Sequence, residues 1–250
     1  MEVHHHPQVE KKRFKEYFLE FIMIFLAVTL GFFAENIREH FADKKKEMQY
    51  LKSFVEDLTN DEANLPLLSM SIEHQQIHPA DSLPVLLKNA DTKTPANLIY
   101  VYFRLMIRQQ GIKAFITDRT IEQAKNSGEM RLITNKQISD SLIDYYKQIG
   151  FVAYLQESLF EMKRVLTQNI RPVLNGYDYT TLIDTADHIV NPNRNLYLLS
   201  SGQPDINSCL MSISEIRGLS ITIRNTIVVI RNKATTIKKL INEKYHFEIK

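Results

Sequence analysis

Two histidines four residues apart are the first candidates for chemistry in this chain. His74 and His78 would share one face of a helix, with Glu73 adjacent, and imidazole nitrogens at this spacing can hold a zinc ion. A third ligand is not evident in the sequence, so surface histidines are the simpler interpretation. We expect no metal and no cofactor, and a metal-dependent hydrolase stays as an alternative.

Carboxylates also recur at helical spacing. Asp57 and Asp61 lie on one face of an expected helix, with Glu56 beside them, and a carboxylate pair can perform acid–base chemistry. Acids on a solvated helix face are the ordinary explanation, and we expect these residues to be solvated.

A further group of polar side chains lies in the longest stretch without periodicity, residues 173–205. Asp178, Asp184, Asp187 and His188 cluster there, and long ordered connections are often functional. If the protein has a ligand site, we expect it in this stretch. The alternative is a connection between helices that packs on the fold and binds nothing. The sequence contains no P-loop, GxSxG, HExxH or dinucleotide-binding motif. We therefore expect no catalytic residues and no enzymatic activity.

The strongest pattern is apolar and lies near the N-terminus. Residues 17–37 carry no charge between Phe21 and Ala34. A helix over this range would be about 31 Å long at about 1.5 Å per residue, which matches the hydrocarbon thickness of a bilayer. The residues at a candidate cleavage site are not small, as a signal peptidase would require. We predict an uncleaved, single-pass transmembrane helix, and a buried core helix is the alternative.

Basic residues flank this segment on both sides, as expected at the level of the lipid headgroups. They are Lys11, Lys12, Arg13 and Lys15 before it, and Arg38 and Lys44 to Lys46 after it. The first cluster lies directly against the membrane, so we expect the N-terminus in the cytoplasm. The protein would then lie in the bacterial cytoplasmic (inner) membrane, with its C-terminal domain periplasmic rather than cytoplasmic.

Small residues within the segment predict close helix packing. Ala27 and Gly31 are four residues apart, Ala34 lies close to the same face, and Glu20 shares it. Small side chains let two helix backbones approach closely in lipid, and a carboxylate inside the apolar region tends to face protein. We expect the helix to pack on a second copy or on a partner's membrane helix. Alternatively, Glu20 reaches the headgroups and Gly31 is incidental.

Composition indicates a folded, mainly helical region after the anchor. The 250 residues are 44% hydrophobic and 24% charged, with only seven glycines, a composition that can bury a core and disfavours a turn-rich β architecture. The net charge of +2 comes without a dense basic stripe, so we expect no nucleic-acid partner. A single cysteine, Cys209, excludes an intrachain disulfide and a multi-cysteine zinc site.

The last forty or so residues carry a heptad pattern sustained for about four heptads. Its seam positions are Ile213, Ile216, Ser220, Ile223, Ile227, Ile230, Ala234, Ile237 and Ile241. A second long helix is expected from Lys136 to Ile170, capped by Asn135. Proline at position 66 is expected to break the first helix. Shorter helices are expected over residues 67–77, 85–89, 96–110, 119–126 and 182–190.

These elements predict an all-α fold, because each apolar helix face must be buried on another. One N-terminal transmembrane helix would continue into an up-down helical bundle with a long C-terminal heptad helix. The expected domains are a polar tail (1–16), the transmembrane helix (17–37) and the helical bundle domain (38–250).

Two stretches carry a resemblance. The first, residues 20–39 and 47–65, has the anchor followed by the pattern YLxxxxxDLxxDxxxL. The second, residues 119–149, has a helix ended by SG, then RLI, then a helix ending in YY. This order resembles a family of single-pass membrane proteins common in Bacteroidota. The resemblance implies location and fold, and it carries over no activity and no catalytic residue.

The anchor, the heptad helix and the missing catalytic motifs favour a membrane-anchored helical scaffold or accessory subunit. It would bind protein partners, as a homo-oligomer or with another membrane protein, and perform no catalysis. A ligand-sensing helical bundle coupled to a membrane helix is the alternative, although no signalling output domain is recognisable.

Overall fold

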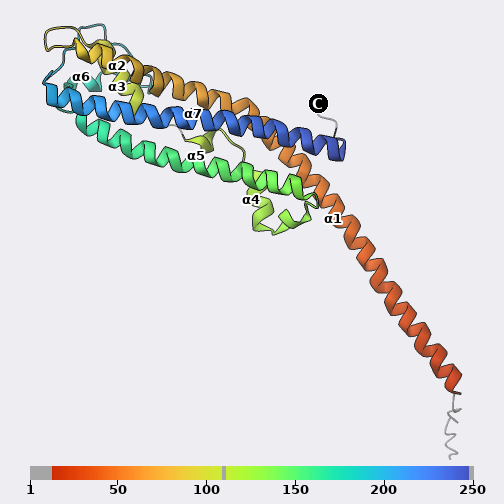
Figure 1. Cartoon of the computed structure of the whole chain (residues 1–250). Coiled ribbons are helices and arrows are strands. Elements are labelled where there is room, and N and C mark those ends of the chain that lie inside the picture. Colours follow the sequence, from red (N-terminus) through yellow and green to blue (C-terminus); the bar gives the residue numbers. More distant parts are fainter. Residues whose placement is uncertain (1–12, 109–110, 248–250) are drawn as a thin grey trace, which may run out of the picture. The chain divides into compact units, whose positions relative to one another are not determined.

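The computed structural model describes residues 13–108 and 111–247, and over these residues the protein is all-α without a β-strand. In chain order the elements are α1 (Phe14–Ile72), η1 (Glu73–Ile77), α2 (His78–Lys88), α3 (Asn97–Ile107), η2 (Ile112–Ala114), α4 (Arg119–Asn126), η3 (Glu129–Leu132), α5 (Lys136–Asn169), α6 (Gly176–Thr180) and α7 (Gln203–Tyr245). The helices divide between two compact units, Met1–Gln49 and Tyr50–Lys250 (Figure 1).

The first unit is described from Arg13 onward and consists of the N-terminal part of α1. Its apolar side chains face outward, with Met23 64% and Phe32 73% exposed. Among the described residues, α1 with its continuation to Lys88 is the one helix long and apolar enough to cross a membrane. Its most apolar 18-residue window has a mean hydropathy of 2.1, and none of that window is buried. Most of the expected polar tail lies outside the described residues.

The second unit has a core built from helix seams. Every predicted seam position of α7 is buried, Ser220 and Ala234 included, which confirms the C-terminal heptad helix. In the part of α1 that belongs to this unit, Asp57 is buried, and a seam of further buried positions advances by three and four residues in alternation. The seam positions are Leu51, Phe54, Leu58, Asp61, Leu65, Leu68 and Ile72.

Ion pairs fix the direction of α7 against the first helices of this unit. Each joins an acid of α1, η1 or α2 to a base of α7: Glu62–Lys238 at 2.5 Å, Glu73–Arg224 at 2.5 Å, and Asp81–Arg217. The residue number falls along α7 as it rises along its neighbours, so α7 runs antiparallel to them. Two of these pairs are well exposed, and such pairs contribute only about 0–1 kcal/mol each, whereas Glu62 and Lys238 are largely covered.

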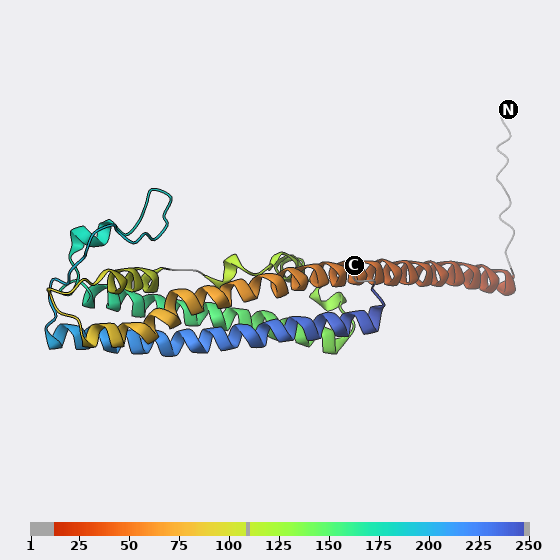
Figure 2. The same ribbon diagram turned by 90° about the horizontal axis from the view of Figure 1, so that it is seen from above.

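Other hydrogen bonds give the directions of α3 and α5. Asn169 of α5 donates to Ser212 of α7 over 2.9 Å, and Lys163 of α5 donates to the carbonyl oxygen of Arg108, directly after α3, over 2.5 Å. Nearer the start of α5, Asp144 pairs with Lys233. Helix α5 is therefore antiparallel to α7. It is antiparallel to α3 as well, because Tyr100, earlier in α3, bonds to Asn175, beyond the end of α5, and the second unit is the predicted up-down bundle. Figure 2 shows α5 and α7 side by side along their length.

The expected break at Pro66 is wrong, because α1 continues through it to Ile72 and π-helix η1 joins it to α2. Proline within a helix costs about 3 kcal/mol. Leu65, Leu68 and Ile72 are each at most 4% exposed, and burying such side chains contributes about 1.5–3 kcal/mol apiece. Core packing therefore outweighs the local cost, and the separate helices expected at 67–77 and 85–89 do not form.

The corner between α4 and α5 follows the prediction closely. Helix α4 has the expected bounds, and Gly128 adopts φ 70°, a left-handed conformation that glycine favours. The Asn135 side chain accepts a hydrogen bond from the Ile138 amide and caps α5. Helix α3, in contrast, ends at Ile107 rather than at position 110.

The expected helix at 182–190 is also wrong. The Asp184 side chain accepts hydrogen bonds from the amides of Ala186 and His188, and Asp187 adopts φ 61°. An isolated antiparallel bridge joins Ile183 to Ile189. Aspartate side chains that bond to nearby backbone compete with helix formation, and here they close a tight turn.

Candidate functional site

The carboxylate pair of α1 is buried, which corrects the expectation of a solvated face. Asp57 and Asp61 are both 0% exposed. Asp57 accepts a hydrogen bond from the Thr120 amide at 3.1 Å and pairs with Arg119 at 3.3 Å. Both contacts come from the start of α4.

Asp61 lies one turn further along α1 and accepts hydrogen bonds from the Thr117 amide and the Tyr145 hydroxyl, each at 2.6 Å. Burial raises the pKa of Asp61 to about 6. The two hydrogen bonds act to lower this pKa, and the nearby Asp57 acts to raise it. The two acids fasten the 117–120 segment to α1, so their geometry is that of a structural anchor rather than of an open acid–base pair.

The histidine pair lies on the surface of the second unit without a third candidate metal ligand beside it among the described residues. His74 and His78 are exposed, and Glu73 is engaged by Arg224 of α7 at 2.5 Å. The His78 ring stands edge-on to Tyr102 at 5.6 Å between centroids. Within residues 13–108 and 111–247, no group of three or more His, Cys, Asp or Glu side chains could hold a metal ion.

The acids of the irregular stretch are dispersed over separate contacts. Asp178 pairs with Arg194 at 2.6 Å, and Asp187 with Arg108 at 3.0 Å. Asp184 accepts the local backbone hydrogen bonds described above and lies 3.2 Å from the His188 ring. The structure therefore does not bring these four residues together as one cluster.

Helix α3 holds this stretch in place. Asn97 donates to the carbonyl oxygen of Arg194 at 2.8 Å and accepts from the amide of Leu196 at 2.8 Å. The Tyr100 hydroxyl donates to the carbonyl oxygen of Tyr197 and accepts from the amide of Asn175. These bonds account for an ordered connection without a ligand.

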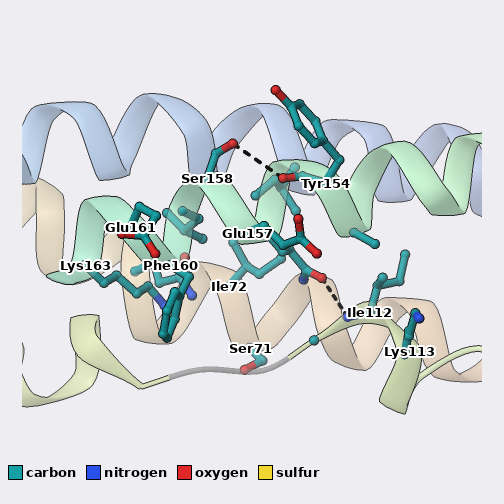
Figure 3. A pocket seen from close by; sticks show the side chains of 16 residues that line it. Ser71, Ile72, Ile112, Lys113, Tyr154, Glu157, Ser158, Phe160, Glu161 and Lys163 are labelled. Atoms are coloured by element: carbon teal, nitrogen blue, oxygen red, sulfur yellow. Dashed lines mark hydrogen bonds between the residues drawn. The ribbon is translucent and has the colours of Figure 1, made fainter.

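A pocket of about 790 Å³ lies elsewhere in the bundle, between the end of α1, η1, the 111–113 segment and the middle of α5. Figure 3 shows Lys163 and Phe160 at one end of its lining, Ile112 and Lys113 at the other, and Ser71 and Ile72 between them. Volumes of about 300–1,000 Å³ are usual for small-molecule sites.

Two polar side chains of this pocket are buried. Lys163 is 4% and Gln76 5% exposed. Gln76 belongs to η1, where the amide of His78 bonds to the carbonyl oxygen of Glu73. Single π-turns are frequent at functional sites. Burial alone lowers the pKa of Lys163 to about 8.

Sequence reasoning missed this pocket, although a signal was present. Lys163 stands four residues after Leu159 and three before Leu166, both of which belong to the buried stripe of α5. A lysine at a seam position must be buried or must distort the helix, so the register could have singled it out.

The residues predicted to pack in the membrane all lie on the surface of the first unit. Glu20, Ala27, Gly31 and Ala34 are exposed. A Cβ atom added at Gly31 would meet no atom within 4 Å, so this face offers room for another helix. Comparisons of the chain with protein-family models, with curated proteins and with solved structures return no match.

Proposed function

We propose that the protein is a single-pass, membrane-anchored helical scaffold or accessory subunit that binds protein partners and performs no catalysis. The observation that carries the proposal is the apolar surface of residues 17–37, none of whose most apolar window is buried. Contiguous apolar surface of this extent is unusual on a soluble protein, whereas a lipid bilayer covers it.

The flanking basic residues support a bacterial cytoplasmic membrane location with the bundle in the periplasm. Lys and Arg near the start of the helix favour a cytoplasmic N-terminus. Reporter fusions at Lys250 test this orientation. Alkaline phosphatase activity, with no fluorescence from a reporter that is active only in the cytoplasm, is expected. The reverse pattern would place the bundle in the cytoplasm.

Anchoring itself is tested by extraction. The protein should remain in the membrane pellet through carbonate treatment and leave it only with detergent. The intact mass of the extracted chain should still include residues 17–37, because an uncleaved anchor is not processed. Recovery in the soluble fraction, or a chain shortened to begin near Glu35, would contradict the anchor.

A partner-binding role is supported by one face of α5. Ile143, Phe151, Tyr154 and Val165 are 48% to 62% exposed, and their spacing places them within about 80° of one another around the helix. Exposed apolar groups gathered on one face are typical of protein interaction sites.

Photo-crosslinking in intact membranes tests this face. A benzoylphenylalanine in place of Phe151 should give a discrete adduct, and the same group in place of Asn232, an exposed polar residue of α7, should not. Equal labelling at both positions, or none at Phe151, would remove α5 as the docking face.

The alternative of a ligand-sensing bundle is favoured by the pocket beside Lys163 and is developed below. A metal-dependent hydrolase remains the other alternative. Elemental analysis of the purified protein tests it, since one bound metal ion per chain would be required.

A further inference from the structure

The ammonium group of Lys163 lies inside the bundle with one hydrogen bond to the described residues. Its side chain is almost fully buried, and within the described part of the chain Nζ donates one hydrogen bond, to the carbonyl oxygen of Arg108 at 2.5 Å. A lysine ammonium has three N–H donors. Burial of a charge is costly unless an opposite charge or further acceptors compensate it, and here one neutral oxygen does so.

The Gln76 amide provides a second buried polar group in the same lining. Its Oε1 accepts a hydrogen bond from the buried Ser220 hydroxyl at 2.8 Å. This bond fixes the orientation of the amide, since Oε1 is directed at α7. Gln76 also lines the pocket, and the nitrogen of its amide carries two further donors.

The remaining walls are largely apolar. Ile72, Ile112, Leu159, Phe160 and Ile223 contribute to them. Other titratable groups of the lining are Tyr154, Glu157, Glu161 and Lys113, and all four are exposed. Glu161 is paired with Arg164 at 3.1 Å. Lys163 is thus the only buried charge of the described lining.

We propose that this pocket binds a small amphipathic carboxylate. The carboxylate would accept hydrogen bonds from Lys163 Nζ, with the Gln76 amide as a further donor, and the apolar body of the ligand would lie against Ile72, Phe160 and Ile223. A charge-assisted hydrogen bond in a partly dehydrated site is stronger than its counterpart in water. Every lining residue belongs to the second unit, so the proposal does not depend on anchoring.

Two probes with one aromatic ring isolate the contribution of the charge. Full-length protein in lipid nanodiscs is titrated with 4-fluorophenylacetate or with the neutral 4-fluorophenylacetamide, and the ¹⁹F line width is followed. Empty nanodiscs provide the blank. The acid should bind saturably and at least about tenfold more tightly than the amide, a difference of about 1.4 kcal/mol. Equal binding of the two probes, or no saturable binding of the acid, would overturn the proposal.

Substitutions then locate the site. Lys163→Met keeps the length of the side chain, removes the buried charge and should abolish the preference for the acid. Lys136→Met, at an exposed position at the start of α5, is the matched control and should retain it. Ala153→Phe, which adds bulk to the lining, should weaken both probes. Thermal unfolding of each variant checks that the bundle is intact, and an unchanged acid preference in folded Lys163→Met would refute the assignment.

The pH dependence gives an independent readout. The anion binds the protonated amine, and the pKa of Lys163 lies near 8. Affinity for the acid should therefore fall by about tenfold per pH unit above that value, while affinity for the amide stays level. A constant acid affinity up to pH 10 would show that another group binds the carboxylate.

Discussion

At Asp61, burial and hydrogen bonding act in opposite directions on the same carboxyl group. Hydrogen bonds from Thr117 and Tyr145 favour the ionised form, yet desolvation outweighs them and raises the pKa from its ordinary 3.8 to about 6. The folded protein therefore binds a proton on Asp61 more tightly than the unfolded chain does. This contribution to stability is fully present below pH 3.8 and is lost as the pH rises through about 6.

The pH dependence of unfolding tests this sign. Asp61→Asn removes the titration while keeping an oxygen for the Thr117 amide. The stability of the wild type relative to Asp61→Asn should decrease by roughly 3 kcal/mol between pH 3.5 and pH 7, at about 1.4 kcal/mol per pKa unit. Denaturant unfolding followed by circular dichroism measures it. Asp140→Asn, at an exposed site of α5, should show no such trend, and a difference that increases with pH would contradict the raised pKa.

Individual polar residues were harder to place from the sequence than apolar ones. Asp61, Lys163 and Ser220 all occupy seam positions of their helices. Ser220 was assigned correctly, because the unbroken isoleucine pattern around it fixed the register. Asp61 was not, because the groups that bury it, the Thr117 amide and the Tyr145 hydroxyl, lie far away in the sequence.

At the scale of elements, heptad spacing predicted the long helices correctly, whereas Pro66 led to the wrong prediction of a helix break. The bounds of α4 and the cap of α5 depend on capping and on a left-handed glycine, both of which are local signals. The continuity of α1 through Pro66 depends on the burial of Leu65, Leu68 and Ile72 in the core of the bundle, and no local sequence pattern contains that information. The π-turn at η1 is likewise not predicted by the spacing of apolar residues.

The seam of α7 gives a direct test of this packing. Ile227 is 1% exposed and Val229, two residues on, is 53% exposed. Ile227→Ala should lower the free energy of unfolding by about 2–5 kcal/mol, because a large buried side chain is truncated. Val229→Ala should change it by no more than about 0.5 kcal/mol. Thermal or denaturant unfolding of the detergent-solubilised chain measures both, and similar values would mean that the seam is not a packed core.

At the scale of the whole molecule, the sequence predicted an exposed apolar helix and a separate bundle. The register of α5 could mark Lys163 as a buried lysine, but the sequence could not reveal the pocket around it. The lining comes from α1, η1, η2, α5 and α7, elements that only the tertiary fold brings together. The packing face of the anchor, in contrast, can be predicted from the sequence, because its residues lie on one helix and their spacing alone places them on one face.

Self-association of that helix is the remaining test of the proposed function. Glu20, Ala27, Gly31 and Ala34 fall within about 60° of one another around an α-helix. A Cβ at Gly31 has open space, so Gly31→Ile leaves the single helix intact and adds bulk only where a second helix would approach. In lipid, close van der Waals contact replaces the hydrophobic effect, and a branched side chain at the contact prevents it.

A bilayer reporter assay of the isolated helix should therefore show weaker association for Gly31→Ile. Thr29→Ile adds similar bulk on the opposite face, since Thr29 is rotated by about 160° from Gly31 at about 100° per residue, and it should associate like the wild type. Cross-linking of the full-length protein in membranes should follow the same order. A wild-type helix that is monomeric in the reporter, together with a full-length protein that migrates alone in mild detergent, would reduce the anchor to a tether and leave partner binding to the bundle.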